Sequence, residues 1–215
     1  MDTVRRHLDT AFRRPVADVS TRVFDVLAER LSADPRPRML DAGCGTGAGT
    51  QRLALCHPQA LIIGVDKSAL RLAAGARTAV RIPNAQLVRC DLVDFWLLAA
   101  RAGWRFVTTH LLYPNPWPKP EHLRRRWHAH AVLPALLATS ERIELRTNWA
   151  VYAEELALAL DLAGWQANLE ALLVPDTQAA LTPFERKYAC SGHTLWHVVA
   201  RAPGLTPRDP LQHVR

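Results

Sequence analysis

The chain has 215 residues, of which 49% are hydrophobic and 22% are charged, a composition that excludes disordered and collagen-like proteins. Its length suits one folded domain with at most a small addition. Lys and Arg total 27 against 20 Asp and Glu, which gives a formal net charge of +7. An excess of basic residues favours an anionic partner, nucleic acid above all, although GC-rich genomes also tend to encode arginine-rich proteins.

No apolar run approaches the length of a membrane span, and the charged N-terminus carries no apolar core of an export signal. None of the cysteines forms a C-x-x-C pair, so we expect free thiols in a reducing cytoplasm. Cys190, His193 and His197 imitate the spacing of metal ligands, but three ligands do not complete a structural zinc set of four. We therefore expect a cytoplasmic protein that binds no membrane and no metal.

The periodicity of the chain predicts an N-terminal helical segment over residues 1–34, an α/β domain over 35–203 and a flexible tail over 204–215. Between the last two strands we expect a polar loop without a helix. Strands that alternate with helices at this spacing predict a parallel sheet covered on both faces. The expected strands cover residues 39–42, 61–65, 86–90, 106–113, 143–147, 166–173 and 194–201. The expected helices cover residues 50–56, 69–80, 92–102, 121–138 and 151–163.

A glycine-rich turn follows the first expected strand. Glycines allow a tight turn and a close approach of the backbone to a ligand, next to the free N–H groups of the following helix. Dinucleotide sites use G-x-G-x-x-G/A, which Gly43, Gly45 and Ala48 fit loosely. S-adenosylmethionine (SAM) sites place an acid two residues before G-x-G-x-G, and Asp41, Gly43, Gly45 and Gly47 fit that pattern fully. The sequence therefore favours SAM as the cofactor.

Two further acids end the second and third expected strands. Asp66 stands 21 residues after Gly45, at the spacing of an acid that accepts the ribose hydroxyls of a nucleotide cofactor. Asp91 occupies the place where SAM enzymes often hold the adenine amino group, although one such Asp is usually a helix N-cap. Together with Asp41, these acids predict a ligand crevice at the carboxyl edge of the sheet.

The fourth expected strand ends in a turn with three prolines, which hold it extended and rigid. This turn would display Asn115 beside the cofactor and offer Trp117 as a flat face for a base. Lys119 and the run Arg124–Arg126 follow directly. Because arginine binds phosphates with forked donors, this placement favours RNA over a merely solvated helix face.

In these motifs the chain resembles the bacterial TrmB-type tRNA (guanine-N7)-methyltransferases, over roughly residues 38–201. The family turn [F/S]-D-P-W-P-K, followed by a His and a basic cluster, is matched by Asn115–Lys119, His122 and Arg124–Arg126. The family segment T-D-x-x-x-Y-x-E is matched by Thr147–Glu154. A third segment, T-x-F-E-x-[R/K], is matched by Thr182–Lys187.

The resemblance implies a class I SAM-dependent methyltransferase with a Rossmann-like, seven-stranded, mostly parallel sheet and an antiparallel last strand. It implies methyl transfer from SAM to N7 of a guanosine in tRNA, of the variable-loop type. Asn115 and Asn148 would be the catalytic residues, with Asn148, Thr182 and Glu185 around the base. The cofactor would be held by Asp41, Gly43, Gly45, Asp66 and Asp91. The phosphates would meet Lys119, Arg124, Arg125 and Arg126.

The family has Asp at the two positions that Asn115 and Asn148 occupy here. An amide oxygen accepts a base N–H but brings no full charge to a cationic transition state. Two alternatives therefore stay open: a SAM-dependent enzyme with another target, such as an exocyclic amine, or a tRNA-binding paralogue with weak or no catalysis. The sequence leaves open whether the protein is a monomer or a homodimer.

Overall fold

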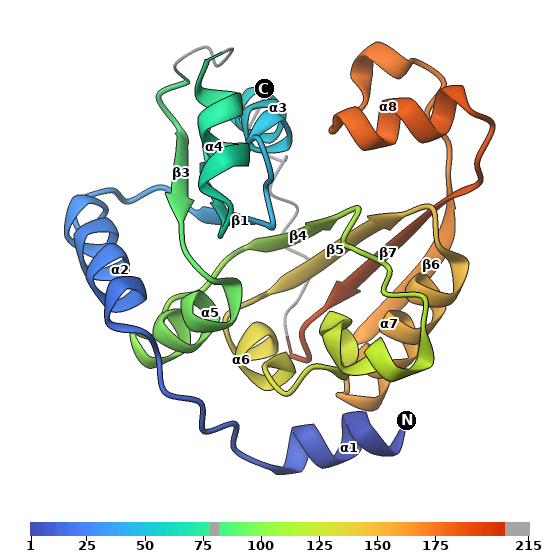
Figure 1. The fold of residues 1–215 in the computed structure, drawn as a ribbon, viewed down its shortest axis with the longest axis horizontal. Coiled ribbons are helices and arrows are strands. Elements are labelled where there is room, and N and C mark those ends of the chain that lie inside the picture. The colour runs from blue at the N-terminus through green and yellow to red at the C-terminus, as the bar shows by residue number, and fades with distance from the viewer. Residues whose placement is uncertain (78–81, 205–215) are drawn as a thin grey trace.

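A seven-stranded sheet crosses the middle of the protein in our computed structural model, which describes residues 1–77 and 82–204 (Figure 1). The spatial order of the strands is β3-β2-β1-β4-β5-β7-β6. Neighbouring strands from β3 to β5 are parallel, whereas β7 runs antiparallel to both β5 and β6. This confirms the expected sheet and its antiparallel last strand. The strands are β1 (Arg38–Ala42), β2 (Leu61–Asp66), β3 (Ala85–Arg89), β4 (Thr108–Leu112), β5 (Arg142–Thr147), β6 (Gln166–Leu172) and β7 (Leu195–Arg201).

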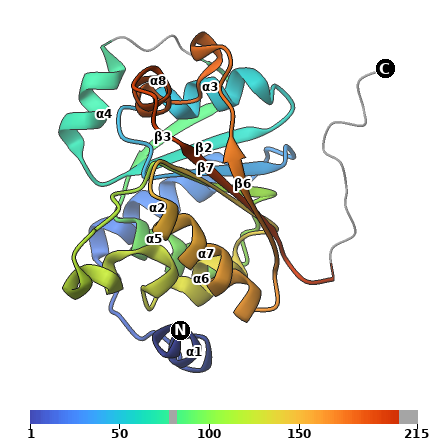
Figure 2. The same ribbon diagram turned by 90° about the vertical axis from the view of Figure 1, so that its right-hand side faces the viewer.

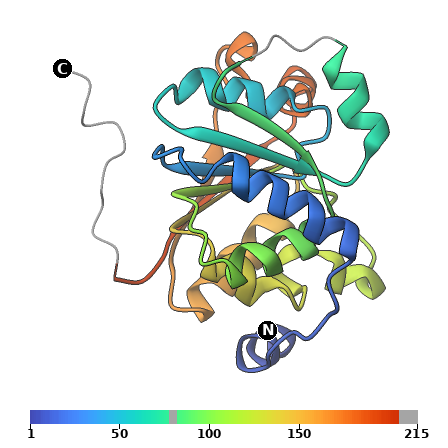
Figure 3. The same cartoon turned by 90° about the vertical axis from the view of Figure 1, so that its left-hand side faces the viewer.

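Helices cover both faces of this sheet. Figures 1 and 2 show α3, α4 and α8 on one side and α5, α6 and α7 on the other, with α1 beyond α6. Figure 3 shows α2 beside α5 on the second side. The α-helices are α1 (Asp2–Asp9), α2 (Asp18–Arg30), α3 (Ala48–Cys56), α4 (Ala69–Ala76), α5 (Leu92–Arg101), α6 (Leu133–Ala138), α7 (Ala150–Leu162) and α8 (Pro183–Cys190). The 3₁₀ helices are η1 (Pro120–Arg125), η2 (Trp127–Ala129) and η3 (Thr177–Ala179).

The larger hydrophobic core lies between the sheet and the layer of α2, α5, α6 and α7. Its centre is aromatic: Phe24 of α2 lies 5.6 Å from Phe95 of α5 and 4.7 Å from Trp104, measured between ring centroids. Such pairs add to the free energy of area burial. The N-terminal segment 1–34 is thus joined to the α/β domain, because α2 supplies part of its core.

The single helix expected over residues 121–138 is wrong. The chain forms η1, η2 and α6 there, separated by extended backbone at Arg126 (ψ 139°) and His130 (ψ 143°). At Arg126 the break turns the side chain inward, and the next N–H, that of Trp127, donates to the hydroxyl of Tyr152 (3.0 Å). Contacts to another helix have therefore replaced the helical hydrogen bonds that the local sequence favours.

The loop expected between the last two strands also proves wrong, because it contains α8. Thr182 is the N-cap of this helix, with its hydroxyl oxygen accepting the N–H of Glu185 (3.0 Å), and Pro183 occupies the first turn. The T-x-x-E spacing is a helix-start signal that was visible in the sequence.

Two expectations fall partly outside the described residues. The helix expected over 69–80 is described as α4 up to Ala76, and residues 78–81 lie beyond the description. The tail expected over 204–215 lies outside the described residues except for Gly204.

Candidate active site

The glycine-rich turn joins β1 to α3 at the carboxyl edge of the sheet. Gly43 and Gly45 both have positive φ angles (+83° and +59°), which glycine adopts without a Cβ clash. A Cβ placed on Gly43 would meet only the Leu92 side chain, at 3.8 Å, and one on Gly45 only the Arg71 side chain, at 4.0 Å. The turn therefore leaves open space beside bare backbone, as a cofactor cradle requires.

Asp41 lies beneath this turn at the end of β1. Its side chain accepts a hydrogen bond from the Thr50 hydroxyl (2.7 Å), and the residue is 2% exposed. Burial raises the pKa of Asp41 to about 6, with a further rise from the charge of Asp66 and a decrease from the Thr50 hydrogen bond. Asp41 is thus poised to exchange a proton near neutral pH, and a cationic ligand would favour its charged form.

Asp66 ends β2 and is 4% exposed. One of its carboxylate oxygens accepts the N–H of Gly45 (3.0 Å) and the other accepts the N–H of Ser68 (2.7 Å). The first bond ties the acid to the glycine-rich turn from the next strand. Arg71 reaches the same carboxylate at 3.5 Å.

Asp91 is the N-cap of α5. Its carboxylate accepts the N–H groups of Val93 (3.0 Å) and Asp94 (3.4 Å), and Arg14 lies 3.6 Å away. This is the capping role that an Asp at a strand end most often has. The adenine contact expected for Asp91 stays a prediction that this structure does not test.

The proline-rich turn after β4 contains two non-glycine residues with positive φ, Tyr113 (51°) and Trp117 (45°). Bulky residues rarely adopt this conformation, which concentrates at functional sites. Asn115 is exposed between them, and its Oδ1 accepts the N–H of Trp117 (3.2 Å). That bond uses one of the two lone pairs of the amide oxygen, so the second lone pair and the amide NH₂ of Asn115 are left for a ligand.

A buried arginine holds this turn in place. The guanidinium of Arg126 donates two hydrogen bonds to the carbonyl of Trp117 (3.2 and 3.0 Å) and is paired with Glu155 of α7. The Arg126 side chain is only 9% exposed. The expected phosphate contact of Arg126 is therefore withdrawn, because its side chain is nearly buried and three of its five N–H donors are used inside the protein.

Asn148 follows β5, the strand next to β4, at the same edge of the sheet. It is half-buried, and none of the described residues makes a hydrogen bond to its side chain. The N–H of Trp149 instead donates to the Thr147 hydroxyl (3.1 Å). The structure thus brings the ends of β4 and β5 together at this edge, with the Asn148 amide unengaged.

Glu185 is buried under α8, with 1% of its surface exposed. Its carboxylate accepts hydrogen bonds from Arg146 of β5 (3.1 Å), from the Tyr113 hydroxyl (3.3 Å) and from the N–H of Leu181 (3.0 Å). Burial, followed by the charge of Glu185, raises the pKa of Tyr113, which stays protonated and donates. Glu185 therefore anchors α8 over the ends of β4 and β5.

Thr182 also lies close to the glycine-rich turn. A Cβ placed on Gly49 would approach the Thr182 methyl group to 3.3 Å and the Asp41 carboxylate to 3.3 Å. The base contacts expected for Thr182 and Glu185 remain predictions, and in this structure both side chains are engaged within the protein.

The remaining basic residues after the turn face solvent. Lys119, Arg124 and Arg125 are exposed, and none of them forms an ion pair with any residue that the structure describes. The guanidinium of Arg125 lies 4.6 Å from the centroid of the Trp117 ring, which keeps it beside the turn.

The described residues contain neither a membrane-spanning helix nor a cluster of metal ligands. No helix within residues 1–77 and 82–204 is long and apolar enough to cross a membrane. Over the same ranges there is no group of three or more His, Cys, Asp or Glu side chains that could hold a metal ion.

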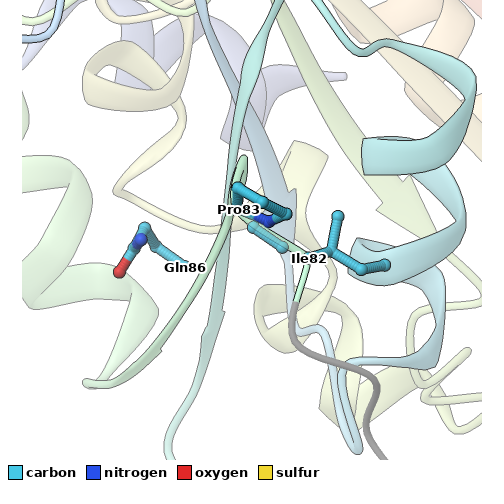
Figure 4. A pocket seen from close by; sticks show the side chains of 4 residues that line it. Ile82, Pro83 and Gln86 are labelled. Carbon is cyan, nitrogen blue, oxygen red and sulfur yellow. The ribbon is translucent and has the colours of Figure 1, made fainter.

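A surface hollow lined by Ile82, Pro83, Ala85 and Gln86 lies at the start of β3, at the opposite edge from the glycine-rich turn (Figure 4).

Comparison with known proteins identifies the family. Residues 35–198 match the family model described as "Putative methyltransferase". A tRNA (guanine-N(7)-)-methyltransferase of Thiobacillus denitrificans is 33% identical over 175 residues, which are 77% of this chain and 75% of the relative. The chain belongs to the tRNA (guanine-N7)-methyltransferase family. Another member, from Leifsonia xyli subsp. xyli, is 29% identical and covers 77% of this chain and 76% of its own.

Solved structures support the fold assigned to this family member. The 16S rRNA methyltransferase KamB has a TM-score of 0.58 at 19% identity, covering 88% of this chain and 96% of its own. A 16S rRNA (adenine-N1)-methyltransferase from Catenulisporales acidiphilia, solved with SAM, has a TM-score of 0.57 at 21% identity, covering 87% and 93%. The fold is that of the class I SAM-dependent methyltransferases, as expected from the sequence.

Sequence reasoning missed the residues that hold this site together. Arg146 and Glu155 were not singled out, and Tyr152 was noted only as part of a family segment. In the structure Arg146 binds Glu185, Tyr152 accepts the N–H of Trp127 and Glu155 pairs with Arg126. The spacing of Tyr152 and Glu155, three apart on α7, places both on one helical face. The spacing indicates that Tyr152 and Glu155 share a helix face, but it does not indicate which segment that face contacts.

Proposed function

We propose that this protein transfers a methyl group from SAM to N7 of a guanosine in tRNA, in the variable loop. The observation that carries the proposal is the position of two turns. The glycine-rich turn follows β1 and the proline-rich turn follows β4, and these strands are parallel neighbours at the point where the strand order reverses. Ligands of α/β sheets bind in that crevice.

The residues of the crevice fit SAM, which supplies a methyl group on a positively charged sulfur. Bare backbone at Gly43 and Gly45 admits a ligand closely, and the buried acids Asp41 and Asp66 suit its ammonium and its ribose hydroxyls. Asp91 would serve the adenine amino group in addition to capping α5.

Asn115 and Asn148 would hold the target base. Guanine N7 is a lone pair and needs no deprotonation, so the residues have to orient the base rather than remove a proton. Oδ1 of Asn115 accepts the N–H of Trp117 with one lone pair, so its other lone pair can accept an N–H of the guanine base.

The test is methylation of tRNA that lacks 7-methylguanosine. Purified protein in excess would be mixed with such tRNA and SAM, and digested nucleosides would be identified by mass spectrometry. We expect 7-methylguanosine, with Asp66→Ala as the control that weakens cofactor binding. Methylation of another base would replace the proposed target, and tRNA binding without any methylated product would replace the enzymatic assignment.

The acidity of Asp41 leads to a prediction for cofactor binding. Its pKa near 6 means that the free protein loses the carboxylate charge as the pH falls below 6. If the charged form serves the ligand ammonium, affinity for S-adenosylhomocysteine should fall by up to about tenfold per pH unit below that value. Calorimetry from pH 8 to pH 5 measures this.

Asp41→Asn is the matched variant for that measurement. It should bind weakly over the whole pH range and show a flat profile. Asp66→Asn should weaken affinity and keep a pH-dependent profile whose midpoint moves to lower pH, because the charge of Asp66 raises the pKa of Asp41. A wild-type profile that is flat through pH 6 would contradict the assigned role of Asp41.

A further inference from the structure

Helix α1 lies outside the residues that match the family model, yet it is docked firmly on the domain. Val4 is 3% exposed and packs with Leu133 of α6 and Ala159 of α7. Leu8 packs against the same cluster. Because its apolar side is fixed, the polar side of α1 holds a defined position on the surface.

That position adjoins the basic segment that follows the candidate active site. Figures 1 and 2 show α1 next to the short helices between β4 and α6. Arg6 of α1 and Arg124 of η1 both lie close enough to His7 for their charges to lower its pKa, in addition to the larger effect of burial. Two guanidinium groups from distant parts of the sequence therefore lie near one side chain, where α1 contacts η2.

Four exposed basic side chains of α1 and of the segment after the proline-rich turn have no paired carboxylate in the described part of the chain. Arg6, Lys119, Arg124 and Arg125 are exposed and form no ion pair within residues 1–77 and 82–204. Arg5 differs, since Asp2 lies 3.6 Å from it. The carboxylates on the same elements, Asp2, Asp9 and Glu121, form no ion pair with these four side chains in the described residues. Like charges that are not paired with carboxylates repel one another, and an anion bound between them removes that repulsion.

We infer that α1 extends the RNA-binding surface, with Arg6 and Arg124 binding backbone phosphates of tRNA outside the target nucleotide. The inference rests on the proposed function for the identity of the RNA. Arg125, held on the Trp117 ring, marks the end of this surface at the active site, and Arg6 marks its far end. The α1 surface thus contacts the body of the tRNA rather than the methylated base.

The experiment is the salt dependence of tRNA affinity, measured without SAM. Each phosphate contact contributes about 0.7–0.9 to the slope of log affinity against log salt. Arg6→Gln should therefore reduce the slope by about that amount and weaken binding about five- to tenfold at 0.1 M salt. Arg22→Gln is the control, because Arg22 is exposed on α2, at the other end of the helical layer (Figure 1), and has no ion pair among the described residues.

A short RNA hairpin that carries only the target loop gives the second comparison. The hairpin is designed too short to extend from the Trp117 turn to α1, so Arg6→Gln should bind it as the wild type does, whereas Arg125→Gln should bind it more weakly. An unchanged slope for full tRNA in Arg6→Gln, or an equal loss in Arg22→Gln, overturns the inference. Binding is measured without methyl transfer. The result for Arg6 can therefore be read even if the proposed methylation of guanine N7 is not observed.

Discussion

Replacing Asn115 by Asp is expected to raise the single-turnover rate of tRNA methylation by up to about 10²–10³-fold. Methylation at N7 places a positive charge on the guanine ring, and a fixed negative charge beside the base stabilises that charge as it develops. A preorganised electrostatic partner of this kind is worth about 10²–10³ in rate. Because the ground-state base is neutral, the added charge favours the transition state, which is the condition for a higher turnover.

The structure shows that this change can be accommodated. One oxygen of Asp would accept the N–H of Trp117 as Oδ1 of Asn115 does now, and the other would face the ligand where the NH₂ group stands. Asn148→Asp adds a second carboxylate at the neighbouring strand end. Asn115→Ser is the control, since it is small and uncharged, and it should not speed the reaction.

The measurement is methyl transfer with enzyme in excess over tRNA, with the methylated base identified by mass spectrometry. A slower rate in Asn115→Asp, with unchanged affinity for SAM and tRNA, would count against guanine N7 as the target. It would favour a site in which the neutral amide is the required partner.

Replacing Arg126 by Ala is expected to lower the free energy of unfolding by about 3 kcal/mol. Removing one member of a buried ion pair typically costs about 3–5 kcal/mol, because the other charge loses its partner. The lower value applies here since Glu155 is 30% exposed and can be partly solvated. The carbonyl of Trp117 loses two hydrogen bonds at the same time, in a turn whose backbone conformation is unfavourable by itself.

Arg125→Ala is the matched control, because it removes an adjacent arginine from the same run. Its side chain is exposed and has no ion pair in the described part of the chain, so its unfolding free energy should change by less than about 1 kcal/mol. Urea unfolding of both variants gives the comparison, and tRNA affinity gives the opposite order: Arg125→Ala should lower the affinity for tRNA and flatten its salt dependence more than Arg126→Ala does. Equal unfolding free energies for the two variants would contradict the assigned separation of roles.

The contrast between Arg125 and Arg126 also shows where sequence reasoning stops. Hydrophobic runs that end in Asp41 and Asp66 predicted strands and a ligand crevice, because burial and the β-to-turn transition are local properties. Three consecutive arginines look alike in a sequence. Only the position of Glu155, which lies 29 residues further along, turns Arg126 inward.

The same reason limits what the sequence says about Glu185. A carboxylate in a family motif suggested a base contact, and the sequence could not show that Arg146 of β5 and Tyr113, which follows β4, also contact it. Such pairing depends on tertiary contacts that no local pattern encodes. The cap formed by Thr182 was, by contrast, a local signal, and it could have predicted α8.

The place of β7 in the sheet has a consequence for synthesis of the protein. Within the sheet of the described residues, β7 pairs with β5 and β6, and β6 pairs with β7 alone. During translation β6 therefore emerges without a partner and keeps an unpaired edge until residues up to Arg201 have left the ribosome. Folding of this half of the sheet must await the last part of the chain, so a ribosome that stops shortly before that point leaves an unfinished, aggregation-prone intermediate.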